Sequence, residues 1–179
     1  MLKKILAAVV ILVVALVVLV ATRPGTFRVE RSVVIEASIQ PLYDTVADLS
    51  RWDRWSPWSH LDPAQKVTIE GGAGRVGTSY AWAGNDQVGE GRMTITAVRP
   101  PLQVRMKLEF LKPWPSTSET VFDLFAESTG TRVVWTMTGD LDFIGKAMCL
   151  VKDMDKMVGP DFERGLATLK KGTEDGSLR

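Results

Sequence analysis

The sequence Leu102-Gln-Val-Arg-Met-Lys-Leu-Glu-Phe-Leu111 alternates apolar and polar side chains from its first residue to Phe110. Successive side chains of a β-strand point to opposite faces of the sheet, so this alternation predicts a strand with one face buried and the other in water. Half-buried strands of this kind are typical of antiparallel sheets. The stretch therefore predicts an antiparallel sheet with one covered face.

More strands are expected on both sides of this stretch, because short apolar segments alternate with turn residues. Gly84-Asn-Asp86 is a good hairpin connection, and Ser128-Thr-Gly130 marks another turn. The glycine-rich loop Gly71–Gly74 lacks the Gly-Lys-Ser/Thr ending of a phosphate-binding loop and joins strand to strand, which favours a hairpin. The remaining expected strands are 27–36, 66–70, 78–83, 87–98, 117–127 and 131–140.

Three tryptophans at intervals of three lie in Asp48-Leu-Ser-Arg-Trp-Asp-Arg-Trp-Ser-Pro-Trp58. Such spacing places the rings of Trp52, Trp55 and Trp58 on one side of a helix or 3₁₀ turn. We expect Pro57 to end that turn, because residues before proline avoid the α region. Two interpretations stay open: the rings close one end of a hydrophobic core, or they line a ligand cavity.

Beyond the last expected strand, apolar residues recur at helical spacings of three and four from Phe143 to Leu169. Pro160 interrupts this stripe, so either the helix is kinked there or a new helix begins with Pro160 near its first position. A sheet with one apolar face and a helix with an apolar stripe bury both surfaces when the sheet curls around the helix. The expected fold class is α+β, with a curved antiparallel sheet wrapped around a long C-terminal helix.

The N-terminal segment Ile5–Ala21 is an unbroken run of 17 apolar residues. As a helix it is close to the minimum length that spans a bilayer core. Lys3 and Lys4 before it suit both a signal peptide and an anchor. The run is longer than a usual signal core, and Leu19 stands where a cleavage site after Ala21 needs a small residue, so an uncleaved anchor is favoured.

The basic residues around this segment give no clear orientation, because Arg23, Arg28 and Arg31 follow it closely. A short basic N-terminus with no second hydrophobic segment still favours export of the rest of the chain. We therefore expect a single-pass membrane protein with its domain outside the cytoplasm. The expected divisions are an anchor at 1–22, a linker at 23–26, a domain at 27–171 and a flexible tail at 172–179.

Composition excludes several classes of site. The 179 residues contain one cysteine, Cys149, and one histidine, His60, so an internal disulfide, a thiolate metal cluster and a zinc site with several histidines are impossible. The net charge is +1 and no basic stripe is present, which argues against nucleic-acid binding. We expect no metal, no cofactor and no nucleic-acid partner.

Five segments between Phe27 and Lys171 match a known pattern. They are Phe27-Arg-Val-Glu-Arg-Ser-Val-Val-Ile-Glu-Ala37, Trp52-Asp-Arg-Trp-Ser-Pro-Trp58, Gly89-Glu-Gly-Arg-Met-Thr-Ile95, Gly130-Thr-Arg-Val-Val-Trp135 and Gly159-Pro-Asp-Phe-Glu-Arg-Gly-Leu-Ala-Thr-Leu-Lys170. The tryptophan motif and the closing Asp-Phe-Glu-Arg-Gly-Leu are the more specific parts. With these segments the chain resembles the START/polyketide cyclase/Bet v 1-like (SRPBCC) superfamily, in particular its membrane-anchored bacterial polyketide cyclase/dehydrase-like proteins. The resemblance to these proteins implies the bacterial inner membrane as the location.

The resemblance implies a helix-grip fold with an apolar cavity between the sheet and the C-terminal helix. Members bind lipids, sterols, polyketides or other hydrophobic molecules, and some catalyse cyclisation or dehydration. The residues we expect to be candidates for the cavity wall are large and apolar or aromatic. They are Trp55, Trp58, Tyr80, Trp82, Met106, Phe110, Phe122, Trp135, Met154, Met157 and Phe162.

Three functions fit this sequence. The favoured one is a membrane-tethered module that binds or carries a lipid-like molecule, which needs only an apolar cavity and a few polar groups. A cyclase or dehydratase would need a positioned acid or base, for which Tyr43, Asp53, Tyr80 and Glu90 are candidates if they line the cavity, whereas His60 is expected in an exposed loop. A protein-interaction role in the cell envelope is the third.

Overall fold

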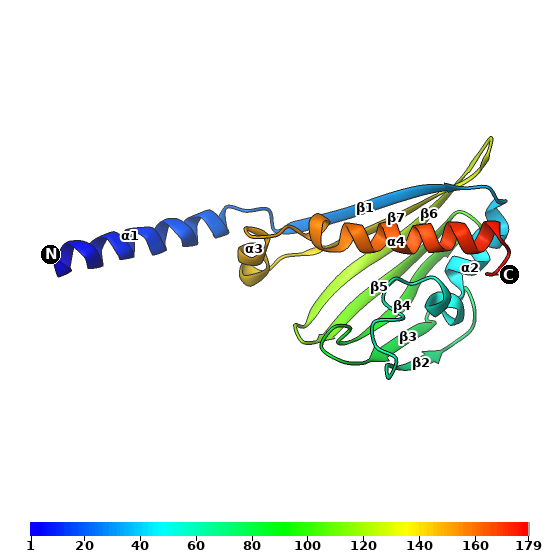
Figure 1. Cartoon of the computed structure of the whole chain (residues 1–179), viewed down its shortest axis with the longest axis horizontal. Coiled ribbons are helices and arrows are strands. Elements are labelled where there is room, and N and C mark those ends of the chain that lie inside the picture. The colour runs from blue at the N-terminus through cyan, green and yellow to red at the C-terminus, as the bar shows by residue number, and fades with distance from the viewer. Residues whose placement is uncertain (179) are drawn as a thin grey trace.

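The protein forms a seven-stranded antiparallel sheet that curves around one long helix, with a separate apolar helix at the N-terminus (Figure 1). The computed structural model describes residues 1–178. The strands lie in the order β1-β7-β6-β5-β4-β3-β2, so only β1 is out of sequence order. This is the α+β helix-grip fold that the sequence predicted. The strands are β1 (Thr26–Ile35), β2 (Lys66–Glu70), β3 (Ser79–Ala83), β4 (Glu90–Arg99), β5 (Gln103–Lys112), β6 (Ser116–Glu127) and β7 (Gly130–Asp140).

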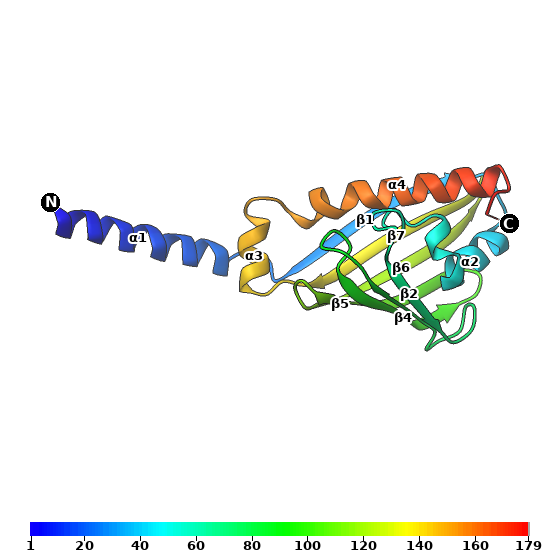
Figure 2. The same cartoon turned by 60° about the horizontal axis from the view of Figure 1, so that its bottom comes forward.

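Helices occupy both ends of the domain and its concave face. The short helix α2 and the 3₁₀ helix η1 follow β1; η1 ends at Arg54, before Pro57, so of the three tryptophans expected on one turn it contains only Trp52. The long helix α4 lies across the concave face of the sheet, as two views of the chain show (Figures 1 and 2). The helices are α1 (Leu2–Ala21), α2 (Ile39–Ala47), η1 (Leu49–Arg54), α3 (Phe143–Cys149) and α4 (Met154–Glu174).

The C-terminal helical region divides at a different place from the one the sequence indicated. Pro160 lies inside α4 and begins no helix; the break is near Leu150, and Asp153 caps the start of α4 by accepting a 2.8 Å hydrogen bond from the Lys156 amide. The apolar spacing could not show this break, because it continues through the connection. α4 runs to Glu174, beyond the expected domain end at 171, and the buried Leu178 donates its amide to the Gly172 carbonyl at 2.9 Å.

Large aromatic side chains join α4 to the sheet. The ring of Phe162 on α4 stacks on Trp135 of β7 with 3.9 Å between the ring centroids. A Cβ atom on Gly165, one turn further along α4, would lie 2.9 Å from the Trp135 ring and 3.0 Å from Pro57. The helix therefore packs against the sheet and the tryptophan motif at a distance that only glycine allows here.

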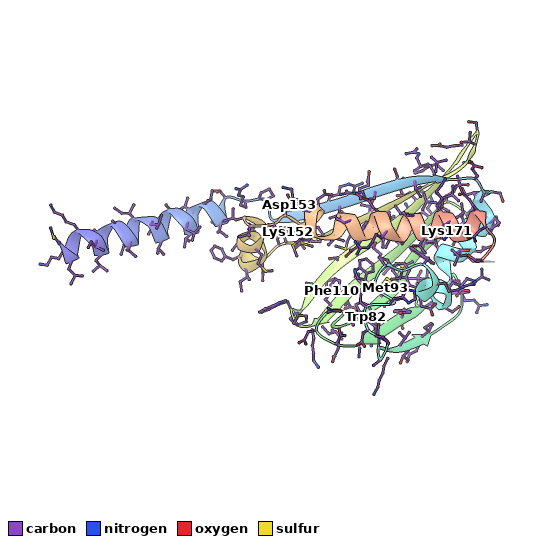
Figure 3. The ribbon with its side chains drawn as sticks, viewed as in Figure 1. Trp82, Met93, Phe110, Lys152, Asp153 and Lys171 are labelled. Atoms are coloured by element: carbon purple, nitrogen blue, oxygen red, sulfur yellow. The ribbon has the colours of Figure 1, made fainter. Side chains whose placement is uncertain are left out.

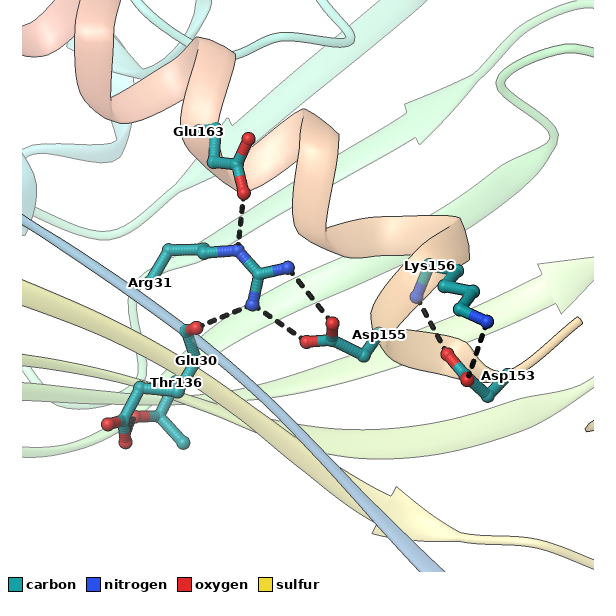
Figure 4. Close-up of polar contacts among 7 residues, drawn as sticks. All are labelled: Glu30, Arg31, Thr136, Asp153, Asp155, Lys156 and Glu163. Carbon is teal, nitrogen blue, oxygen red and sulfur yellow. Dashed lines mark hydrogen bonds and ion pairs between the residues drawn. The ribbon is translucent and has the colours of Figure 1, made fainter.

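Ion pairs fasten the outer side of α4 to β1. The guanidinium of Arg31 contacts Asp155 at 2.7 Å and Glu163 at 2.6 Å, two residues on the same side of the helix (Figure 4). Arg31 lowers the pKa of Asp155, mainly through the hydrogen bond. Because both carboxylates are exposed to water, these pairs contribute orientation more than stability.

One edge of the sheet faces the N-terminal helix. Thr26 pairs with Asp140, Ser116 with Phe110, and Lys112 with Glu90, so the start of β1, the end of β7 and the β5–β6 turn lie at the same edge. The β3–β4 turn at Gly84–Gly89 lies there too, because Ala83 pairs with Glu90. We call this the anchor edge, after the membrane anchor that the sequence predicts for α1, because α1 ends beside it (Figure 1).

The N-terminal helix stands apart from the domain. α1 is 20 residues long and almost wholly exposed; by length and composition it fits either a membrane span or a signal sequence. Val20, near its end, is its only buried residue, and α1 contacts α3 there. The buried core of the domain begins only at Val29, so α1 adds nothing to it.

We predict that the packing of α4 against the sheet contributes a large part of the free energy of unfolding of the domain. Leu169 of α4 is fully buried, so Leu169→Ala should lower the free energy of unfolding by about 2–5 kcal/mol. Lys171→Ala on the exposed side of the same helix should change it by no more than about 0.5 kcal/mol. Denaturant unfolding of the full chain in detergent micelles, followed by near-ultraviolet circular dichroism, measures both, and equal effects would contradict the prediction.

Candidate functional site

The small side chain of Thr120 leaves space on the concave face of the sheet toward the anchor edge. Alternate residues of β6 face the core: Phe122 and Leu124 fill the half far from the anchor, whereas Thr120 and Ser118 occupy the near half. Strand β4, separated from β6 by β5, has Gly91 on the same face, and the Trp82 ring occupies the place of a side chain there, 2.4 Å from where a Cβ atom would lie. The aromatic core is therefore complete at one end of the sheet and incomplete at the other.

A cavity of about 170 Å³ occupies this space between the sheet, α4 and the loop after the tryptophan motif. Trp82, Met93 and Phe110 come to it from β3, β4 and β5, respectively, and lie close together below α4 (Figure 3). Its wall is mostly apolar and aromatic. The wall residues are Trp52, Ser56, Trp58, Ser59, Gln65, Tyr80, Trp82, Gln87, Val88, Met93, Leu108, Phe110, Thr120, Trp135, Met137, Val158 and Phe162.

The cavity has a buried floor and a partly exposed rim. Trp135, Phe162 and Thr120 at the floor are fully buried. At the rim, the half-exposed side chains include Val88 from the β3–β4 turn and Val158 from the first half of α4. Because the β3–β4 turn belongs to the anchor edge, the rim lies toward α1.

Six of the eleven residues that the sequence proposed for the cavity wall line it: Trp58, Tyr80, Trp82, Phe110, Trp135 and Phe162. The structure places three others elsewhere in the fully buried core, namely Trp55, Met106 and Phe122. Met154 is half-buried against the core, and Met157 is 40% exposed on the outer side of α4. Residue type alone could not separate wall from core.

Sequence reasoning missed the other wall residues for two reasons. Met93 of β4 pairs with Tyr80 of β3, and Leu108 lies two residues before Phe110 on β5, so both point to the same face as the predicted wall residues. Strand alternation could therefore have identified them. Ser59, Gln65 and Gln87 lie in loops and turns whose course no periodicity predicts.

Some polar groups of the wall are hydrogen-bonded within the protein, whereas one buried hydroxyl is not. The indole of Trp135 donates to the Thr120 hydroxyl at 2.9 Å, and that hydroxyl donates to the Thr136 carbonyl at 3.1 Å. The hydroxyl oxygen of Ser59, in contrast, is buried and has no hydrogen-bond partner among the described residues. A buried hydroxyl without a partner is unfavourable, so it marks a point where a bound molecule could be held.

One ionisable side chain, Tyr80, lines the cavity. Burial raises the pKa of Tyr80 to about 12, and the charge of Asp53 adds to the effect. Its hydroxyl is therefore neutral near pH 7 and serves as a hydrogen-bonding group, not as a base.

The other acid–base candidates from the sequence do not line the cavity. Tyr43 is buried with an unpartnered hydroxyl, and Glu90 pairs with Lys112 at 2.7 Å. Asp53 and His60 are exposed. Within residues 1–178, no group of three or more His, Cys, Asp or Glu side chains is placed to hold a metal ion.

We predict a raised titration midpoint for Tyr80. In the Tyr43→Phe variant Tyr80 is the only tyrosine, and its phenolate absorbance should appear near pH 12, not near the ordinary value of about 10. Since the unfolded chain releases this proton first, the stability that Tyr80 contributes is complete below about pH 10 and is lost as the pH rises through 12. A midpoint near pH 10 in a chain with native near-ultraviolet circular dichroism would contradict the buried placement.

Solved structures with this fold come from diverse proteins. The solution structure of the Aha1 dimer from Colwellia psychrerythraea is 20% identical and has a TM-score of 0.61, covering 84% of this chain and 98% of that one. Protein CV1439 from Chromobacterium violaceum is 18% identical with a TM-score of 0.56, covering 85% and 99%. The di-domain ARO/CYC protein StfQ from the steffimycin biosynthetic pathway is 9% identical with a TM-score of 0.62, and the match covers 85% of this chain and 52% of StfQ. At these identities the likeness shows the fold alone.

The family comparison is more specific. No curated protein matches the chain. The family model described as "Polyketide cyclase / dehydrase and lipid transport" matches residues 26–174, which is nearly the whole of the chain after α1. This protein therefore belongs to the polyketide cyclase/dehydrase and lipid transport family, within the START/Bet v 1-like (SRPBCC) superfamily.

Proposed function

We propose that this protein is tethered to a membrane by α1 and binds or carries a lipid-like molecule in the cavity under α4. The observation that carries the proposal is the apolar cavity with the unpaired hydroxyl of Ser59 in its wall. An apolar wall with a few placed polar groups is the usual composition of a site for a hydrophobic small molecule. The description of the family, which includes lipid transport, agrees with this class of ligand.

The size of the cavity limits what it encloses in this conformation. A volume of about 170 Å³ is close to the roughly 150 Å³ of an apolar cavity that holds benzene and is below the roughly 300–1,000 Å³ of drug-sized pockets. The space fits one ring or one segment of an acyl chain. A larger ligand enters when rim side chains such as Val88 and Val158 move aside.

The wall favours binding over catalysis. Cyclisation and dehydration depend on an acid or base whose pKa suits the working pH, and such sites usually bring together two ionisable groups. Tyr80 stands alone in this wall and keeps its proton near pH 7. A cyclase or dehydratase is therefore the second candidate, and an envelope protein-interaction role is the third.

The anchor supports a ligand that resides in a bilayer. α1 is a 20-residue apolar helix with the length of a membrane span, and its two lysines lie at the start. We place the domain outside the cytoplasm, at the outer face of a bacterial inner membrane. Tethering keeps the cavity close to molecules that partition into that membrane.

Blocking the cavity tests the proposal. Val158→Trp puts an indole at the rim, whereas Met157→Trp adds the same group one residue away, on the outer side of α4. We expect native mass spectrometry of the full chain, purified from a bacterial envelope, to show a lipophilic adduct on the wild type and on Met157→Trp but not on Val158→Trp. A folded wild type that retains no adduct and takes up no fluorescent fatty acid would contradict the proposal and favour the interaction role.

Removing the unpaired hydroxyl tests its role as the polar contact. Ser59→Ala should leave the free protein at least as stable as the wild type, because the buried oxygen has no partner to lose. Affinity for the ligand should fall about two- to tenfold, which is the loss of one hydrogen bond.

Ser56→Ala is the matched control for this variant. The hydroxyl of Ser56 accepts a 3.3 Å hydrogen bond from the Trp58 amide, so its removal should lower the stability of the free protein. Unfolding and fluorescent fatty-acid binding of both variants separate the two roles. Unchanged binding in Ser59→Ala would show that the hydroxyl does not contact the ligand.

A further inference from the structure

The short helix α3 carries apolar side chains that the domain does not bury. None of its residues is fully buried, and Phe143, Ile144 and Met148 are each at least half exposed. Val151, just after the helix, is 93% exposed. Ile144, Met148 and Val151 follow at spacings of four and three, which places them on one side of the turn. We call Phe143, Ile144, Met148 and Val151 the α3 patch.

The position of α3 distinguishes this patch from scattered exposed residues. α3 contacts the end of α1 and lies between α1 and the domain (Figures 1 and 2). Lys146 of α3 lies near the linker: its side chain is 3.7 Å from the point where a Cβ atom on Gly25 would lie. If α1 crosses a bilayer, its C-terminal end marks the bilayer surface, and α3 is the first element of the domain at that surface.

The anchor edge exposes a further interfacial residue. Trp114, in the β5–β6 turn, is 71% exposed. Tryptophan is enriched at membrane–water interfaces, because its ring is apolar and its N–H is polar. Lys146 and Lys152 stand beside the patch, as is common for segments that lie on membranes.

We propose that the α3 patch lies in the interfacial layer of the same bilayer that α1 spans, and holds the rim of the cavity toward the lipid. This inference rests on the anchoring role proposed for α1. We assign the bilayer surface as the partner of the patch, because α3 contacts the end of α1, an apolar helix long enough to span a membrane. Burial of four large apolar side chains in that layer offsets their exposure in the free domain.

The consequence concerns how a ligand reaches the cavity. The rim residue Val88 lies in a turn of the anchor edge, and Val158 lies in the first half of α4, which follows α3 directly. With the α3 patch in the interface, this rim faces the bilayer at short range. A lipid-like molecule then passes between bilayer and cavity with little exposure to water.

Site-specific fluorescence on the full chain tests the proposal. Cys149 is the only cysteine, so Cys149→Ser gives a background into which single cysteines are placed at Ile144, Val151, Lys171 and Val13. Each variant is labelled with an environment-sensitive dye and reconstituted into vesicles of phosphatidylcholine and phosphatidylglycerol. Quenchers attached to the acyl chains near the headgroup, or near the chain end, report the depth of each dye.

We expect the dyes at positions 144 and 151 to show a blue shift and quenching by the shallow quencher. Lys171 lies at the far end of α4 (Figure 3), so a dye there should remain water-exposed and unquenched. Position 13 in the middle of α1 should respond to the deep quencher. Replacing Phe143 and Met148 with serine should reduce the quenching at position 151.

The outcomes separate this proposal from the anchoring role. Quenching at position 13 with water-like emission at positions 144 and 151 would overturn the α3 proposal and leave the anchor intact. A blue shift at 144 and 151 that no lipid quencher affects would show a protein contact in place of the bilayer, and would also overturn it. Absence of quenching at position 13 would remove the anchor itself and, with it, the basis of the inference.

Discussion

The packing of α4 into the curve of the sheet is the constraint on which the structure depends. Phe162 stacks on Trp135 at 3.9 Å, and Gly165 lets the helix approach the tryptophan motif, so one half of the sheet closes tightly on the helix. Trp52 and Trp55 fill the remaining space there, with 4.5 Å between their ring centroids. Protein interiors pack densely, so this aromatic cluster sets how closely the helix and the sheet approach each other at this point.

The cavity lies beside this aromatic contact. Trp135 and Phe162 form its floor, so the stacked pair that joins the helix to the sheet also bounds the cavity. On β6 the wall residue is Thr120, whereas Phe122, two residues further along the same face, fills the core with a ring. The size of the side chains along one strand therefore distinguishes the cavity from the core, and the ion pairs of Arg31 with Asp155 and Glu163 join α4 to β1 on the outer side.

The sequence predicted the fold well because the fold depends on periodicity. Alternation in 102–111 identified β5, and the stripe from Phe143 to Leu169 identified the helical region that the sheet surrounds. It predicted the cavity wall less well, because wall and core residues share the same periodicity. Trp58 lines the cavity and Trp55 does not, although they are identical residues three apart. The difference arises from packing partners that are distant in sequence, as does the lack of a partner for Ser59.

The antiparallel order of the strands decides which loops face the anchor. β1 starts at the end of the linker, so the edge where it starts must lie beside α1. Each following turn then alternates between the two edges, which places the β3–β4 turn, the β5–β6 turn and the β7–α4 connection on the anchor side. The β2–β3, β4–β5 and β6–β7 turns lie at the far edge. The β3–β4 turn at the cavity rim therefore lies at the same end of the sheet as the start of β1, where α1 joins the domain, and the membrane role proposed for α1 places this rim on the side of the bilayer.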